Sequence, residues 1–155
     1  MRKLALALAI ALATLCAPVA AKDSLGVYSG WAAFRDKDAP RCYAIAKPRG
    51  NDASGAYASI ATWPRQKIRN QLHVRLSRAA PQGGTVRLRI GTRNFELVAR
   101  GRDAWAKDQR SDAAIVAALR SARAMRVSGA GFSDRYDLAG AATAMDAAVV
   151  GCAAL

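Results

Sequence analysis

The stretch Leu-His-Val-Arg-Leu-Ser-Arg at residues 72–78 alternates apolar and polar side chains at nearly every position. Successive side chains of a β-strand point to opposite faces, so this period of two predicts a strand with one buried face. Thr-Val-Arg-Leu-Arg-Ile at residues 85–90 repeats the pattern, and Pro-Gln-Gly-Gly at 81–84 has the composition of a turn. We therefore predict a hairpin, extended by a third antiparallel strand at residues 95–99.

Further strands are predicted upstream, at residues 27–34, 41–46 and 56–63. Their aromatic side chains are expected to fill a core between sheets, and stacking on a ligand is the alternative. These aromatic residues are Tyr28, Trp31, Phe34, Tyr43, Tyr57 and Trp63.

The hydrophobic period changes in the C-terminal third. Ser111-Asp112 is a good N-cap for a helix that carries Ile115 and Leu119 on its apolar face. Alternation returns at residues 125–128 and 135–138, with a turn at 129–131. Residues 141–150 are apolar almost all round, and Gly151 suits the position just past a helix end. The predicted fold is mainly β, antiparallel and β-sandwich-like, with one or two short α-helices in the C-terminal third.

The beginning of the chain has the composition of a secretory signal. A basic start at Arg2 and Lys3 precedes an apolar run at residues 4–15, and small residues follow at 19–21. The run is shorter than the roughly 20 residues of a membrane-spanning helix, so cleavage is favoured over an anchor. We predict a cleaved signal peptide at residues 1–21, a single β-rich domain at 22–155, and a periplasmic or secreted location.

Two cysteines, Cys42 and Cys152, remain after the predicted cleavage. An even pair in an exported domain predicts one disulfide. A redox or metal pair is the alternative. However, the sequence has no Cys-x-x-Cys, and its single histidine leaves too few ligands for zinc. No metal and no cofactor are predicted.

Several segments resemble the invasion-associated locus B family of exported bacterial proteins, of which this chain would be a distant member. The resemblance lies in Gly30-Trp31, Arg41-Cys42-Tyr43-Ala44, residues 86–97 with Ile90-Gly91, Trp105-Ala106, residues 114–120 and residues 136–144. It implies a β-sandwich-like domain of the periplasm or envelope that has no known catalytic site.

The charge of the chain is strongly positive, at +13, and 18 of its 24 basic residues are arginine. In the predicted hairpin, Arg75, Arg87 and Arg89 share the face opposite the core, with Arg78 and Arg93 near the strand ends. We expect this face to bind an anionic lipid, a polysaccharide or an acidic protein, and a merely solvated face is the alternative. Nucleic acid is not expected, because export separates the chain from it and no recognition motif is present.

The sequence offers little for catalysis. His73 is the only histidine, and its alternation with apolar neighbours predicts a surface position beside Arg75. We therefore expect a noncatalytic envelope protein. The alternative is a periplasmic enzyme or enzyme inhibitor with an unrecognised site, which a pocket with perturbed carboxylates near Asp103 or Asp137 would favour.

Overall fold

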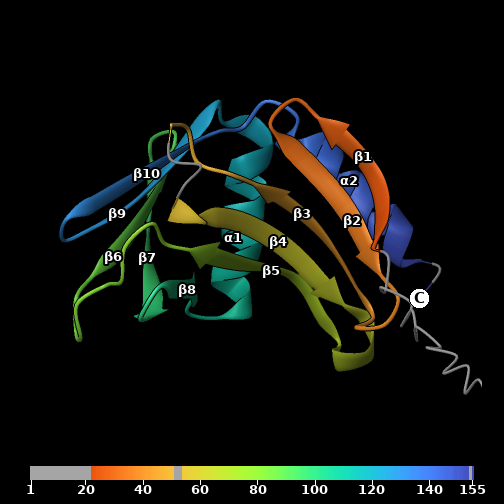
Figure 1. Cartoon of the computed structure of the whole chain (residues 1–155), viewed down its shortest axis with the longest axis horizontal. Coiled ribbons are helices and arrows are strands. Elements are labelled where there is room, and N and C mark those ends of the chain that lie inside the picture. The colour runs from red at the N-terminus through yellow and green to blue at the C-terminus, as the bar shows by residue number, and fades with distance from the viewer. Residues whose placement is uncertain (1–21, 51–53, 154) are drawn as a thin grey trace, which may run out of the picture.

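The structure is a computed structural model that describes residues 22–50, 54–153 and 155. In this part of the chain, ten strands form one antiparallel sheet, against which two α-helices pack (Figure 1). The prediction of a mainly β, antiparallel fold with helices in the C-terminal third is therefore confirmed. The predicted signal peptide at residues 1–21 lies outside the described residues.

All strands belong to one hydrogen-bonded sheet, in the order β1-β2-β3-β4-β5-β8-β7-β6-β9-β10. Every neighbouring pair is antiparallel. The bounds are β1 Asp23–Tyr28, β2 Trp31–Asp36, β3 Arg41–Ala46, β4 Tyr57–Trp63, β5 Ile68–Arg75, β6 Val86–Ile90, β7 Arg93–Arg100, β8 Asp103–Ala106, β9 Ala124–Gly129 and β10 Phe132–Asp137, with a 3₁₀ helix, η2, at Pro64–Gln66.

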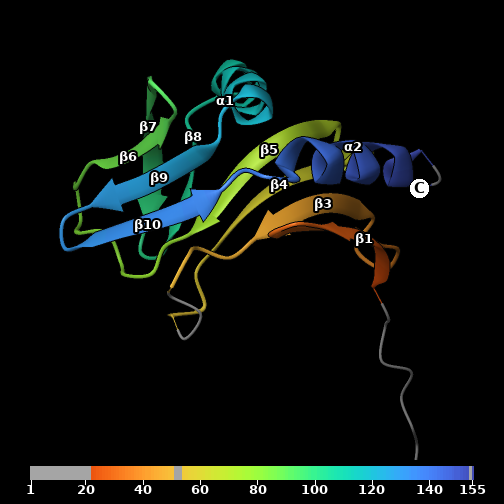
Figure 2. The same ribbon diagram turned by 90° about the horizontal axis from the view of Figure 1, so that it is seen from above.

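Alternation along the strands gives the sheet two unlike faces. In β6, Val86, Leu88 and Ile90 are buried, whereas Arg87 and Arg89 between them are exposed. The inner face carries the apolar side chains and packs against the helices, where it forms the core. We call the opposite side the outer face. Both helices lie on the inner side (Figure 2), so no helix of residues 22–50, 54–153 and 155 covers the outer face.

The two helices cover different halves of the sheet (Figure 2). Helix α1, Gln109–Ser121, packs on β5 to β8, and α2, Ala141–Cys152, packs on β1 to β4. Within the described residues, no helix is long and apolar enough to cross a membrane.

The helix ends differ from the prediction. Helix α1 begins before Ser111, because the Asp108 carboxylate accepts a hydrogen bond from the Ser111 N–H at 2.7 Å and acts as the N-cap. Gly151 lies inside α2 instead of past its end. A Cβ on Gly151 would come within 2.4 Å of Leu25, so glycine here allows β1 to approach the helix closely.

A disulfide joins Cys42 in β3 to Cys152 at the end of α2, as predicted. The two Cα atoms are 5.6 Å apart, although the residues are separated by 110 positions in the sequence. The bridge therefore fastens the last helix to the third strand of the sheet.

The predicted hairpin between residues 72–78 and 85–90 is wrong. These segments are β5 and β6, and both β8 and β7 lie between them. After β5 the chain binds the β7–β8 turn, where the N–H groups of Leu76 and Ala80 donate to the carbonyls of Arg102 and Gly101. A period of two identifies a strand and its buried face but does not identify its neighbours.

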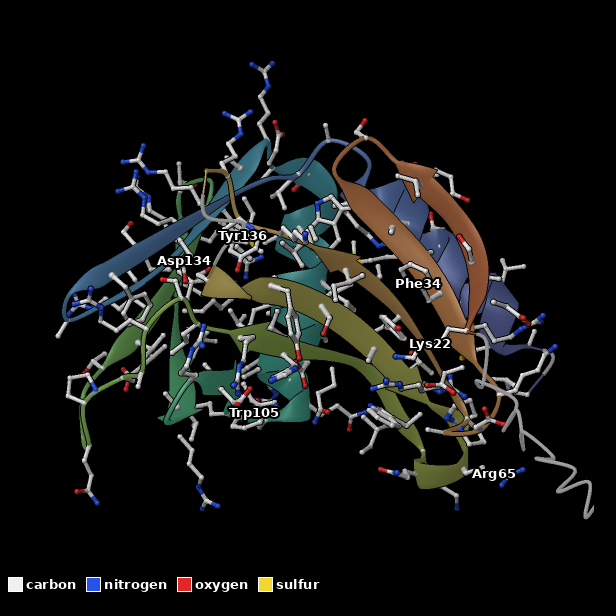
Figure 3. All side chains as sticks on the ribbon, viewed as in Figure 1. Lys22, Phe34, Arg65, Trp105, Asp134 and Tyr136 are labelled. Carbon is white, nitrogen blue, oxygen red and sulfur yellow. A yellow bond between two sulfur atoms is a disulfide. The ribbon has the colours of Figure 1, made fainter. Side chains whose placement is uncertain are left out.

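The predicted strand at residues 27–34 is two strands, because Ser29 and Gly30 form the turn between β1 and β2. The aromatic residues also differ from the prediction. Trp31 is in the core at 1% exposure, with its indole N–H donating to the Asp137 carbonyl at 2.8 Å. Phe34, Tyr43 and several others lie instead on the outer face, where Figure 3 labels Phe34 and Trp105.

Candidate functional site

The arginines predicted to share one face do not all lie together. Arg87 and Arg89 project from β6 onto the outer face. Arg75 is also on the outer face, but β8 and β7 separate its strand from β6, and its guanidinium donates to Asp103 at 2.6 Å.

Arg93 and Arg78 lie away from these three. Arg93 is directly opposite Ile90 and therefore on the inner face, where its guanidinium lies over the ring of Phe95, 5.1 Å from the ring centroid. Arg78 lies beside the β9–β10 turn, with its guanidinium 3.5 Å from the position of a Cβ on Gly131. The single five-residue cluster is therefore wrong, because it depended on the pairing of β5 with β6.

The sheet instead gathers a different set of arginines. Arg89 lies directly opposite Arg126 of β9, which lies directly opposite Arg135 of β10, and Arg87 is the next outward residue of β6. All four side chains are exposed. We call Arg87, Arg89, Arg126 and Arg135 the arginine row. A hollow of about 630 Å³ beside it is lined by three of its members and by Arg123. Sequence reasoning missed Arg126 and Arg135, although alternation at residues 125–128 placed Arg126 on an outward face.

The arginine row has no acidic partner within 4.0 Å among the described residues. Within the described part of the chain, its one side-chain hydrogen bond runs from the Arg89 Nε to the Gly91 carbonyl oxygen, at 3.1 Å. Like charges directly opposite each other destabilise a sheet, so Arg89, Arg126 and Arg135 repel one another, whereas Arg87 lies directly opposite Glu96 of β7. An anion held between the guanidinium groups would relieve this repulsion.

Several carboxylates form ion pairs away from the row. Asp23 binds Arg35, Asp137 binds Arg49 and Asp146 binds Arg120. The Arg35 hydrogen bond holds the pKa of Asp23 below its usual value, and Arg120 does the same for Asp146. For Asp137, the backbone N–H of Ala139 is the main cause of the lowered pKa, followed by Arg49.

These lowered pKa values predict loss of stability in acid. A carboxyl whose folded pKa lies below its unfolded value of 3.8 stabilises the fold fully above that pH, and the contribution disappears as the pH falls through the folded pKa. Burial raises the pKa of Asp112, so this carboxyl lowers the stability of the fold above pH 3.8. We expect the free energy of unfolding, measured by urea titration, to fall steeply only below that pH. In a variant with Asp23, Asp137 and Asp146 changed to Asn the fall should be shallower; an identical profile would contradict this account.

A second polar cluster lies on the outer face around His73. The His73 Nε2 is 2.9 Å from an Asp103 carboxylate oxygen, and the other oxygen of Asp103 binds Arg75. The imidazole stacks on Trp105 with ring centroids 5.3 Å apart, and the Tyr57 ring meets it edge-on at 5.4 Å. His73 and Arg75 therefore share the outer face, as alternation predicted.

The chemistry available to this cluster is limited. The Tyr57 hydroxyl is 3.5 Å from the His73 Nδ1, but burial and the Asp103 charge raise the pKa of the phenol, so it keeps its proton at neutral pH. The Ser59 hydroxyl donates to the His73 backbone carbonyl at 3.5 Å and not to the ring. No group of three or more metal-ligating side chains occurs among the described residues.

Most of the aromatic residues missing from the core surround His73. A pocket of about 340 Å³ on the outer face is lined from β3, β4, β5 and β8. We call it the aromatic pocket, and its lining residues are Lys22, Arg41, Tyr43, Ile45, Tyr57, Ser59, Ala61, Trp63, Gln71, His73 and Trp105. It combines half-buried aromatic rings with basic side chains, which is a composition suited to a ligand.

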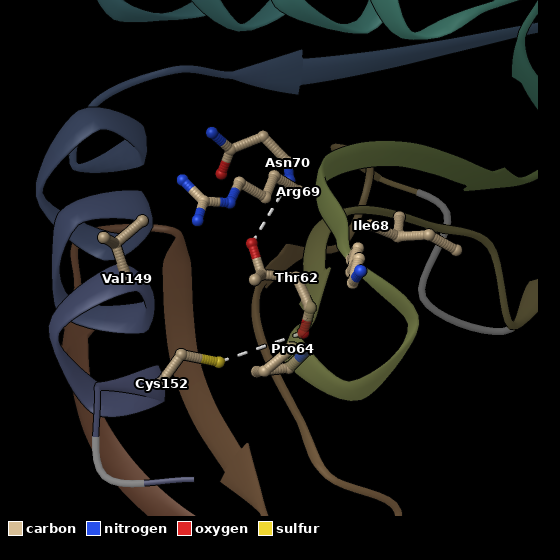
Figure 4. Close-up of a pocket in the computed structure, with 8 residues that line it drawn as sticks. Thr62, Pro64, Ile68, Arg69, Asn70, Val149 and Cys152 are labelled. Carbon is tan, nitrogen blue, oxygen red and sulfur yellow. Dashed lines mark hydrogen bonds between the residues drawn. The ribbon is translucent and has the colours of Figure 1, made fainter.

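Another cavity, of about 620 Å³, lies between α2 and the β4–β5 connection (Figure 4). The Cys152 sulfur at its edge is 3.9 Å from the Thr62 carbonyl oxygen, and the Thr62 hydroxyl accepts the Asn70 N–H at 3.2 Å. Its lining, as far as the described residues form it, has basic side chains but neither a carboxylate nor a histidine. This cavity therefore lacks a pair of groups for acid–base chemistry.

Comparisons with known proteins found no match to any family model, to any curated protein or to any solved structure. The fold and its surface define the class instead, which is a disulfide-linked, mainly antiparallel β protein whose open sheet face carries an arginine row and an aromatic pocket.

Proposed function

We propose that this chain is a noncatalytic protein of the periplasm or envelope, of the invasion-associated locus B type, that binds an anionic partner through the arginine row. The observation that carries the proposal is the row itself, with four exposed arginines on three neighbouring strands and no carboxylate partner among the described residues. The partner would present phosphate or carboxylate groups, as an anionic lipid, a polysaccharide or an acidic protein does.

The shape and spacing of the guanidinium groups in the arginine row support this proposal in addition to the net charge. A guanidinium is planar and presents a fork of donors that matches the two oxygens of a carboxylate or phosphate. Arg89, Arg126 and Arg135 follow one another across adjacent strands, so their spacing is that of the strands, about 5 Å. A partner with several closely spaced anionic groups can therefore contact more than one of them.

The experiment compares two variants that lose the same charge. The row variant changes Arg89, Arg126 and Arg135 to Gln, and the control variant changes the exposed Arg65, Arg69 and Arg110 to Gln. Retention of the protein, expressed from the complete chain, is measured on phosphatidylglycerol vesicles and on alginate beads at increasing salt. We expect the row variant to lose about tenfold in affinity on at least one matrix, while the control stays close to the wild type.

The outcomes separate the possible partners. Loss by the row variant on vesicles alone favours a lipid, and loss on alginate alone favours a polysaccharide. Equal losses by the row and control variants would show that net charge alone attracts the protein, and the proposed face would then be rejected. Equal retention of all three proteins on both matrices would reject it as well.

A periplasmic enzyme or enzyme inhibitor is the second candidate, and the His73–Asp103 hydrogen bond is the observation that favours it. A hollow of about 730 Å³ also contains Asp137. However, the lowered pKa of Asp137 keeps this carboxyl ionised, whereas a general acid needs a raised pKa. The noncatalytic role therefore remains our proposal.

A further inference from the structure

The aromatic pocket is separate from the arginine row and differs from it in chemistry. Its walls contain four aromatic side chains besides His73. The described residues of its lining include Lys22, Arg41 and His73 but no carboxylate. The nearby acids are not in the lining but pair with residues that are: Asp103 binds His73, and Asp36 binds Arg41. A ligand in the pocket would therefore meet rings and positive charge.

Arg41 is held in place before any ligand binds. Its guanidinium lies over the rings of Tyr43 and Trp63, at 4.9 and 5.0 Å from their centroids. Its ion pair with Asp36 is long, at 3.5 Å, and its buried Nε has no hydrogen-bond partner among the residues that the structure describes. Arg41 therefore retains hydrogen-bonding capacity, and its position between two rings reduces the entropy lost on binding.

His73 is fixed in a similar way on the other side of the pocket. Asp103 binds its Nε2, and Trp105 and Tyr57 pack against the ring. Among the described residues, the Nδ1 has only the long 3.5 Å contact with the Tyr57 hydroxyl. Together with the Gln71 amide, it supplies a polar group that can orient a ligand.

The size of the pocket restricts the ligand. A volume of about 340 Å³ is near the lower end of the range for small-molecule sites, which is about 300–1,000 Å³. One ring with a few substituents fits this space. We propose that the aromatic pocket binds a small ring-bearing carboxylate, with the carboxylate at Arg41 and the ring against the aromatic walls. A uronic acid and an aromatic acid share this chemistry.

The test uses four probes, which are glucuronate and its neutral counterpart glucose, and benzoate and its neutral counterpart benzyl alcohol. Binding is measured by calorimetry on the protein expressed from the complete chain. We expect at least one acid to bind about tenfold more tightly than its neutral counterpart, and Arg41→Gln to remove that preference. Arg93→Gln is the matched control, because Arg93 also lies over an aromatic ring but on the inner face.

A second measurement needs no substitution. The chain has three tryptophans, whose indole N–H signals can be followed by NMR. Trp63 and Trp105 line the pocket, whereas Trp31 is buried and its N–H is bound to Asp137. Titration with the binding acid should shift the first two signals and leave that of Trp31 unchanged.

The proposal fails if neither acid binds saturably, if the neutral compounds bind equally well, or if only the Trp31 signal moves. It also fails if Arg41→Gln binds the acid like the wild type. The row variant tests whether the aromatic pocket works independently of the arginine row. It should bind the small acid normally even where it has lost retention on vesicles or alginate. Preference for glucuronate identifies a sugar acid as the ligand, and preference for benzoate identifies an aromatic acid.

Discussion

Replacing both Cys42 and Cys152 by alanine is expected to lower the free energy of unfolding by about 4 to 5 kcal/mol. The bridge closes a loop of 110 residues and so lowers the conformational entropy of the unfolded chain. Removing the bridge raises that entropy and stabilises the unfolded state. The loss is comparable to much of the net stability of a small domain, which is about 5–15 kcal/mol. Urea unfolding followed by tryptophan fluorescence measures the difference.

Reduction of the wild-type protein provides the control, because it breaks the bridge and keeps both sulfur atoms in the core. We expect the reduced wild type to be destabilised nearly as much as the double variant. If the oxidised and reduced proteins unfolded at the same urea concentration, the bridge would not be a stabilising element of this fold.

Gly140→Ala is expected to destabilise the protein by about 3 kcal/mol or more, for two separate reasons. Gly140 precedes α2 with a φ of 82°, a conformation that costs alanine about 1–2 kcal/mol. In addition, a Cβ at this position would lie 1.9 Å from the Tyr28 backbone oxygen, so the end of β1 or the start of α2 would have to move. Thermal unfolding followed by circular dichroism measures the effect.

Gly101→Ala separates the two causes. Gly101 has a φ of 58°, but a Cβ there would meet no atom within 4 Å. This variant should therefore lose only the conformational part, about 1–2 kcal/mol. Equal losses at the two glycines would show that the contact between Gly140 and Tyr28 has no energetic consequence.

The class of fold could be predicted from the sequence because it depends on local pattern. The buried face of β6 follows directly from the alternation of Val86, Leu88 and Ile90 with arginine, and β3 has the predicted bounds. Asp108 shows the limit for helix ends, since both it and Ser111 can serve as N-caps and only the structure identifies which one does.

The order of the strands could not be predicted in the same way. The hairpin between β5 and β6 agreed with the alternation and with the Pro-Gly turn, but β8, a strand of only four residues at Asp103–Ala106, pairs with β5 instead. The cost of closing a loop rises slowly with its length, so a chain can pair distant strands at little extra cost. Local pattern carries little information on that choice.

The candidate site followed the order of the strands and was therefore only partly predictable. Arg87 and Arg89 remain in the arginine row because they belong to one strand, whereas Arg126 and Arg135 join them only through the β6–β9 and β9–β10 pairings. The aromatic pocket was missed for another reason. Tyr43, Tyr57 and Trp63 have the residue types of a core, and only their register shows that they face away from it.

The seam between α2 and the first strands determines when this protein can finish folding. A ribosome releases β1, β2 and β3 early, yet the helix that shields their apolar side is made after every other element. The thiol of Cys42 must wait for more than a hundred further residues before its partner emerges. Neither the packing of α2 on these strands nor the Cys42–Cys152 bridge can therefore form until the segments between them have been made.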